Sequence, residues 1–149
     1  MRTSSLRNLL YLAAGIGLIL SVFAALEVVD ASLSNLCTFN GFFSCQAVLR
    51  SGKTVTLGIE DWTWGVAGFL AILVLAAIAE RRPDDRRPPL GLVALTAAGT
   101  ALSLYFAYVE LALIGALCIV CVSSYVMGWT CLGASVALAR RAPPPDDGR

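Results

Sequence analysis

Histidine is missing from this sequence, and charged residues make up only 14% of its 149 positions. Without histidine there is no Ser–His triad, and the Cys118–Cys121 motif is followed by Val122 instead of the histidine that attached c-type haem requires. Phosphate-binding loops and internal repeats are also missing. The few basic residues are divided among separate segments, which excludes a nucleic-acid-binding patch. With 58% hydrophobic residues, the composition instead indicates a membrane protein.

Four apolar runs are long enough to cross a bilayer, which takes about 20 helical residues. A cleaved signal peptide is an alternative for the first run, although that run is longer than the roughly 7 to 15 apolar residues of a signal core. Residues 90–139 form one apolar stretch of 50 residues that is interrupted only by Glu110. From its length, we infer that this stretch crosses the membrane twice. The expected helices cover approximately residues 9–29, 62–79, 90–109 and 114–137.

We therefore expect an all-α integral membrane protein with a single domain over residues 1–139. A four-transmembrane-helix bundle would carry an outer capping segment, residues 30–61, between helices 1 and 2. The proline-rich tail at residues 140–149 is expected to be disordered and cytoplasmic. Glycines within the helices, such as Gly17 and Gly65, are expected to permit close helix contacts.

The basic residues predict the orientation in the cell membrane. All of them except Arg50 and Lys53 lie before the first run, between the second and third, or after the fourth. By the positive-inside rule, both termini are then cytoplasmic and residues 30–61 face outward. Glu27, Asp30 and Glu110 would be solvated caps on this outer side.

Four of the five cysteines fall on the same outer side, where disulfides persist. Cys118 and Cys121 lie at the start of the last helix, and Cys37 and Cys45 lie in the outer segment. Cys131 is ten residues past Cys121, roughly 15 Å deeper at helical rise, and is expected to be a structural core residue.

One face of the last helix combines two thiols with a phenol. At 100° per residue, Cys118, Cys121 and Tyr125 fall within about 60° of one another. Residues three apart on a helix are about 5 to 6 Å apart, which is within the range that a disulfide bridges. A thiolate at a helix N-terminus is also stabilised by the helix dipole. This pattern favours a reactive dithiol that passes electrons to an acceptor in the lipid.

Two other interpretations of the cysteines remain open. Cys37, Cys45, Cys118 and Cys121 could hold zinc or an iron–sulfur cluster, although the first pair is spaced more widely than a metal knuckle. Alternatively, the protein is a structural tetraspan protein with inert disulfides, which would leave the CxxC at the membrane edge unexplained.

The motifs resemble those of the vitamin K epoxide reductase family. The string Cys118-Ile119-Val120-Cys121-Val122-Ser123-Ser124-Tyr125 is similar to the active-site signature of that family. Cys37 and Cys45, followed by Ser51, resemble its shuttle cysteines and loop serine. Gly58-Ile59-Glu60-Asp61 resembles the entrance to its second helix. Almost the whole chain is covered, as in a prokaryotic-type homologue without a fused thioredoxin-like domain.

The resemblance implies a role for each cysteine of the two pairs. Cys118 and Cys121 would be the active-site pair, with Cys121 reacting with a quinone. Cys45 would exchange with Cys118, and Cys37 would exchange with an external dithiol. These four cysteines are the predicted catalytic residues.

The resemblance also implies a quinone pocket beneath the outer segment. Tyr125 would hydrogen-bond a quinone oxygen, and Ser51 is assigned to the quinone site through the capping loop that it would help to hold. Asp61 stands where the family commonly has Asn, so it is either a protonated donor to the quinone or a helix cap. Trp62 and Trp64 are expected at the membrane interface, and Trp62 is a candidate to flank the quinone ring.

The predicted activity is that of a quinone-dependent thiol–disulfide oxidoreductase. It would oxidise a separate thioredoxin-like (DsbA-type) protein and pass two electrons to menaquinone or ubiquinone without a metal, which supports disulfide bond formation. A vitamin K epoxide or quinone reductase proper shares these motifs. A DsbB-type enzyme is a further alternative, but its CxxC precedes its second cysteine pair.

Overall fold

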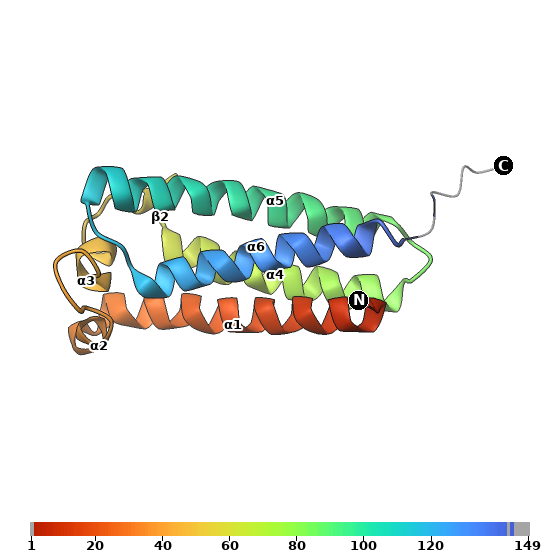
Figure 1. Ribbon diagram of the computed structural model, residues 1–149, viewed down its shortest axis with the longest axis horizontal. Coiled ribbons are helices and arrows are strands. Elements are labelled where there is room, and N and C mark those ends of the chain that lie inside the picture. Colours follow the sequence, from red (N-terminus) through yellow and green to blue (C-terminus); the bar gives the residue numbers. More distant parts are fainter. Residues whose placement is uncertain (1, 143, 145–149) are drawn as a thin grey trace.

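The four expected membrane helices form one bundle in the computed structural model, which describes residues 2–142 and 144 (Figure 1). All four are long and apolar enough to cross a membrane, so the predicted four-helix membrane bundle is confirmed. The helices are α1 (Thr3–Val29), α4 (Asp61–Arg81), α5 (Arg87–Tyr108), which continues as the π-helical segment η1 (Val109–Ile114), and α6 (Ile119–Ala139). The first three extend beyond their apolar runs because helical hydrogen bonding continues into the polar flanks. The last begins at Ile119 instead of the expected residue 114, because the chain reverses after Gly115. The predicted disordered tail falls almost entirely outside the described residues.

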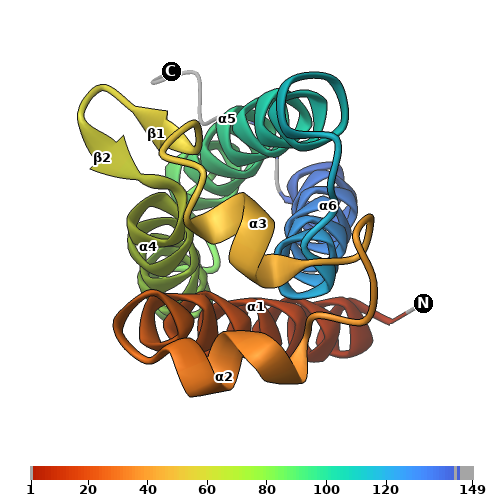
Figure 2. The same ribbon diagram turned by 90° about the vertical axis from the view of Figure 1, so that its left-hand side faces the viewer.

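Each long helix packs against two neighbours, in the ring order α1, α4, α5, α6 (Figure 2). Small residues permit the close approach of α1 to α4. A Cβ atom on Gly17 would overlap the ring of Phe69, and one on Gly65 would overlap the Ser21 side chain. Because lipid tails are as apolar as leucine, such close van der Waals packing is what holds membrane helices together.

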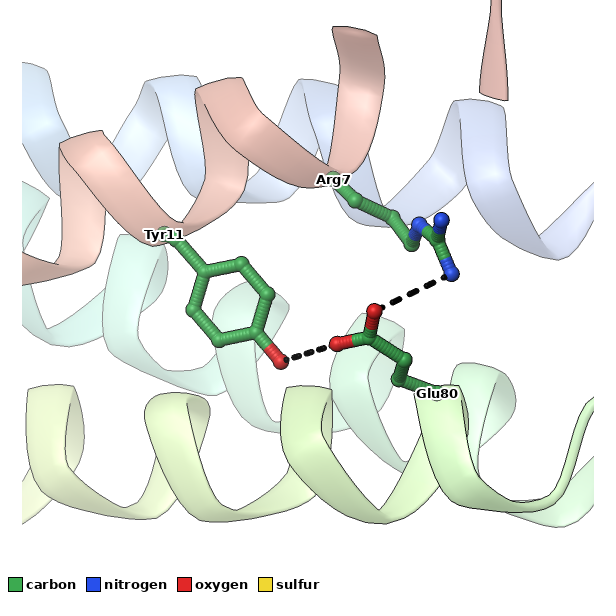
Figure 3. A network of polar contacts seen from close by, with 3 residues as sticks. All are labelled: Arg7, Tyr11 and Glu80. Carbon is green, nitrogen blue, oxygen red and sulfur yellow. Dashed lines mark hydrogen bonds and ion pairs between the residues drawn. The ribbon is translucent and has the colours of Figure 1, made fainter. Parts of the chain in front are cut away.

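At the end of the bundle near the N-terminus, a polar cluster joins α1 to α4 (Figure 3). Glu80 of α4 accepts a hydrogen bond from the Tyr11 hydroxyl at 3.1 Å, and its other oxygen lies 3.4 Å from the Arg7 guanidinium. Arg7 and Glu80 are both more than two-fifths exposed, so this pair fixes α1 against α4 at a solvated edge.

The opposite end of the bundle is covered by the segment between α1 and α4. It contains α2 (Ala31–Leu36), α3 (Cys45–Leu49) and a two-stranded hairpin of β1 (Val55–Thr56) and β2 (Ile59–Glu60). Figure 2 shows α3 lying over the centre of the helix ring. Ser44 starts α3 by accepting a hydrogen bond from Ala47 N–H, a standard N-cap. The predicted capping segment is thus a folded lid with its own short helices.

Two backbone hydrogen bonds fasten this lid to the start of α6. Leu117 N–H donates to Phe42 O at 2.7 Å, and Ser44 N–H donates to Leu117 O at 3.0 Å. Because Leu117 precedes Cys118 and Ser44 precedes Cys45, these bonds set the two cysteines next to each other.

The connection between α5 and α6 differs from the expected short turn at Glu110. The helix continues as η1 to Ile114, and the chain reverses only after Gly115, whose φ of 72° is accessible to glycine without strain. The wider π turn directs the Glu110 side chain into the protein, where it is fully buried. The expectation of a solvated cap at Glu110 was therefore wrong.

Candidate active site

The lid carries the first cysteine pair as a disulfide. Cys37 follows α2, Cys45 is the first residue of α3, and their Cα atoms are 5.8 Å apart. Cys45 is fully buried, whereas Cys37 retains 8% of its exposure. Of the two residues, Cys37 is thus the more accessible to solvent.

The second pair lies directly beneath it, with both thiols free. Cys118 is the N-cap of α6, and its Sγ accepts a hydrogen bond from Cys121 N–H at 3.2 Å. The same Sγ lies 3.3 Å from Cys45 Sγ. A backbone N–H at a helix N-terminus stabilises negative charge on the sulfur it faces. The four predicted catalytic cysteines therefore form one continuous group from the lid to α6.

Glu110 holds this group in place, a role that the sequence analysis missed. Its Oε2 accepts from Cys118 N–H at 3.0 Å, and its Oε1 accepts from the Tyr125 hydroxyl at 2.7 Å. One buried carboxyl thus connects the cysteine at the N-terminus of α6 with the phenol one turn beyond Cys121. The available signal was an acidic residue inside an apolar run, which marks functional sites in membrane proteins.

A cavity of about 380 Å³ opens beside Cys121 among the four long helices. This volume is in the range of small-molecule pockets. Its walls are almost entirely apolar, with Phe69, Ile72 and Phe106 among them. Predicted residues that line it are Cys121, Tyr125, Asp61, Trp62 and Trp64.

Asp61 and the tryptophans form the rim of this cavity at the start of α4. Asp61 Oδ1 accepts from Trp62 N–H at 2.7 Å, as a residue at a helix start does. The Trp62 indole donates to Glu60, and the Trp64 indole donates to Thr56 O at 3.4 Å. The hairpin therefore orients the indoles over the pocket, and the role of Asp61 stays a prediction.

Ser51 lies away from this cavity, in the turn after α3. Its hydroxyl donates to Val48 O at 2.8 Å and accepts from Lys53 N–H at 3.1 Å. These bonds stabilise the lid, so any effect of Ser51 on the pocket passes through α3. Cys131 is buried in the other half of the bundle with Leu10 and Leu92, away from the remaining cysteines.

Glu27 is the second acidic residue that the sequence analysis misplaced. It lies near the end of α1, fully buried, with its Oε1 2.9 Å from Cys37 Sγ. Only Asp30 among the three expected caps is exposed, and hydrogen bonds from Ser32 lower the pKa of its carboxyl. Glu27 was misplaced because the lid folds back over the end of α1 and removes it from water.

Glu27, Cys37 and Cys45 place one oxygen and two sulfurs within 4.8 Å of one another, a spacing that could suit a metal ion. In the observed state the disulfide joins both sulfurs, so neither is a thiolate ligand. The arrangement is suited to thiol–disulfide exchange.

Comparison with known families adds a finding independent of this geometry. The model of the vitamin K epoxide reductase family matches residues 8–136, a stretch that includes every cysteine of the chain.

Proposed function

We propose a function from one premise, that the chain belongs to the vitamin K epoxide reductase family and is therefore an oxidoreductase. In our proposal it oxidises a thioredoxin-like dithiol protein outside the cytoplasm and passes two electrons to a membrane quinone. This activity supports disulfide bond formation in the partner's compartment.

One observation carries this proposal: Cys45 Sγ and Cys118 Sγ are 3.3 Å apart. Thiol–disulfide exchange proceeds by attack of a thiolate on a disulfide sulfur, so the two sulfurs must be able to meet. Here they are already in contact, while Cys45 is bonded to Cys37 and Cys118 lies next to Cys121. A structural protein with inert disulfides does not require this contact.

The exchange steps follow from the order of the sulfurs. The partner's thiolate attacks Cys37 Sγ and releases Cys45 as a thiolate. Cys45 then attacks Cys118 of a Cys118–Cys121 disulfide, and Cys121 is released as a thiolate facing the cavity. The partner's second thiol frees Cys37, which closes on Cys45 and releases Cys118. The partner leaves oxidised, and the active-site pair holds two electrons.

The cavity supports a quinone as the acceptor of these electrons. Its apolar walls and aromatic rim suit a lipid-soluble ring, and Cys121 reaches it from α6. The Cys118–Cys121 dithiol would re-form its disulfide by giving up two electrons, and the quinone would take these electrons and two protons to become quinol. The Tyr125 hydroxyl, beside Cys121 in the lining, would orient the ring.

The orientation in the membrane follows the basic residues. Both α1 and α6 have their lid-distal ends on the side where the α4–α5 connection carries its arginines (Figure 1). We place that side in the cytoplasm and the lid outside, where the disulfide partner would be met.

The function is tested by following quinone reduction in detergent with a reduced thioredoxin-like donor. Cys121→Ser should lower turnover by at least about a hundredfold, because oxygen cannot replace the sulfur in this exchange. Cys131→Ser is the matched control, since Cys131 is buried elsewhere, and it should retain activity. Quinone reduction that survives Cys121→Ser would overturn the proposal.

A further inference from the structure

Glu27 is a buried acid that the exchange steps above do not use. One carboxyl oxygen, Oε1, lies 2.9 Å from Cys37 Sγ, and the other, Oε2, is buried without a hydrogen-bond partner. Within residues 2–142 and 144, the structure gives Glu27 no basic partner. A carboxylate left in this position would be buried, unpaired and only half hydrogen-bonded, which is costly.

The contact with Cys37 indicates which group carries the hydrogen. A disulfide sulfur has no hydrogen to donate, so a hydrogen bond across this 2.9 Å contact in the oxidised state requires a protonated Glu27 carboxyl. When the disulfide is reduced, Cys37 gains a thiol at the same place and can donate in turn. A proton thus lies between Glu27 and Cys37 in both redox states, on the carboxyl when the disulfide is formed and on the thiol when it is reduced.

We propose that Glu27 is the proton donor and acceptor for Cys37, a catalytic residue of the lid disulfide. This inference rests on the proposed exchange through the lid pair. When Cys37 leaves the partner as a thiolate, the Glu27 carboxyl gives it a proton. When Cys37 attacks Cys45, the S–S bond between Cys45 and Cys118 breaks, and Glu27 takes the proton back.

Two observations support this function over simple packing. A side chain that only filled space would be expected to be apolar here, because Glu27 adjoins the cluster of Ala24, Val48 and the buried cysteines. In addition, proton transfer requires contact with the reacting atom, and Glu27 has it with Cys37.

Other titratable groups near this end of α1 have partners of their own. Glu110 bonds to Cys118 and Tyr125, and Asp61 bonds to Trp62. Asp30, on the same side of the bundle, is exposed and bonded to Ser32. Among the elements packed against α1, α2 has no titratable group, and α3 has Cys45. At the lid end, α4 has Asp61 and α6 has Cys121 and Tyr125, with Cys118 as its N-cap; Glu80 and Arg81 of α4 and Cys131 of α6 lie farther along the bundle.

The test uses the full chain with Cys118, Cys121 and Cys131 each changed to Ser, so that only the lid pair remains. Dithiothreitol reduces the Cys37–Cys45 disulfide in detergent over a range of pH, and a maleimide gel shift measures the rate. With Glu27 present, protonation of Cys37 as it leaves the mixed disulfide with dithiothreitol compensates for the scarcity of dithiothreitol thiolate at low pH, so the profile should be flat.

Glu27→Gln should give a rate that rises roughly tenfold per pH unit, with the thiolate fraction of dithiothreitol. The reference chain should exceed the variant by at least about tenfold at the acidic end, with the ratio shrinking as pH rises. Glu80→Gln, at the other end of the bundle, should leave the reference profile unchanged.

Two outcomes would overturn the inference: a constant ratio at every pH, which indicates a structural role, or profiles within about twofold of each other. Maleimide counting before reduction verifies that the disulfide has formed. If Glu27→Gln does not fold, Glu27→Asp retains the carboxyl one methylene farther away and should give an intermediate profile, whereas an unchanged profile would count against proton transfer. No quinone enters this assay, so its failure is separable from failure of the proposed function.

Discussion

The two ends of the bundle use the same kind of side chain in opposite ways. At the open end, which is the end near the N-terminus that the lid does not cover, Glu80 is half-exposed and paired with Arg7 and Tyr11 (Figure 3). At the lid end, Glu27 and Glu110 are fully buried and contact Cys37 and Cys118 instead of a cation. An acid in solvent next to a cation helps to fix helices, whereas a buried acid without one is positioned to hold or move a proton beside sulfur.

Among the substitutions that test this comparison, those at Glu110 should change activity the most. Glu110→Ala removes the acceptor for both Cys118 N–H and the Tyr125 hydroxyl, two buried bonds each costing about 1–3 kcal/mol when left unmade. Quinone-reduction turnover should fall by at least about tenfold, since Cys118 loses its position against Cys45.

Two matched variants separate the parts of this effect. Glu110→Gln keeps an acceptor for Cys118 N–H and should retain more activity than Glu110→Ala. Tyr125→Phe removes only the second bond and should raise the KM for the quinone more than it lowers turnover with the donor. Equal activity of Glu110→Ala and the unaltered protein would break the comparison.

The smallest effect is expected at the open end. Glu80→Gln removes a half-exposed ion pair and should lower the free energy of unfolding by no more than about 1 kcal/mol. Thermal unfolding in detergent measures this change, and quinone reduction should be unaffected. A large loss of activity would show that the two ends are coupled and that their division of roles is wrong.

The sequence predicted the fold well because membrane crossing depends on the length of apolar runs, and this length can be counted in the sequence. It also predicted the two cysteine pairs, and the structure brings Cys45 to Cys118 through the bonds around Leu117. Glu27 and Glu110 could not be placed in this way. Their burial depends on a lid that folds back over α1 and on a π-helical turn, neither of which leaves a simple periodic pattern.

Electron flow between the lid and α6 is the central claim, and trapping Cys45 with Cys118 tests it most directly. In a full chain carrying Cys37→Ala, Cys121→Ala and Cys131→Ala, only these two thiols remain. Mild oxidation should join them, and mass spectrometry of the digested protein should recover one disulfide-linked peptide pair containing Cys45 and Cys118. Recovery of both cysteines as separate, alkylated thiols in the folded protein would contradict the account.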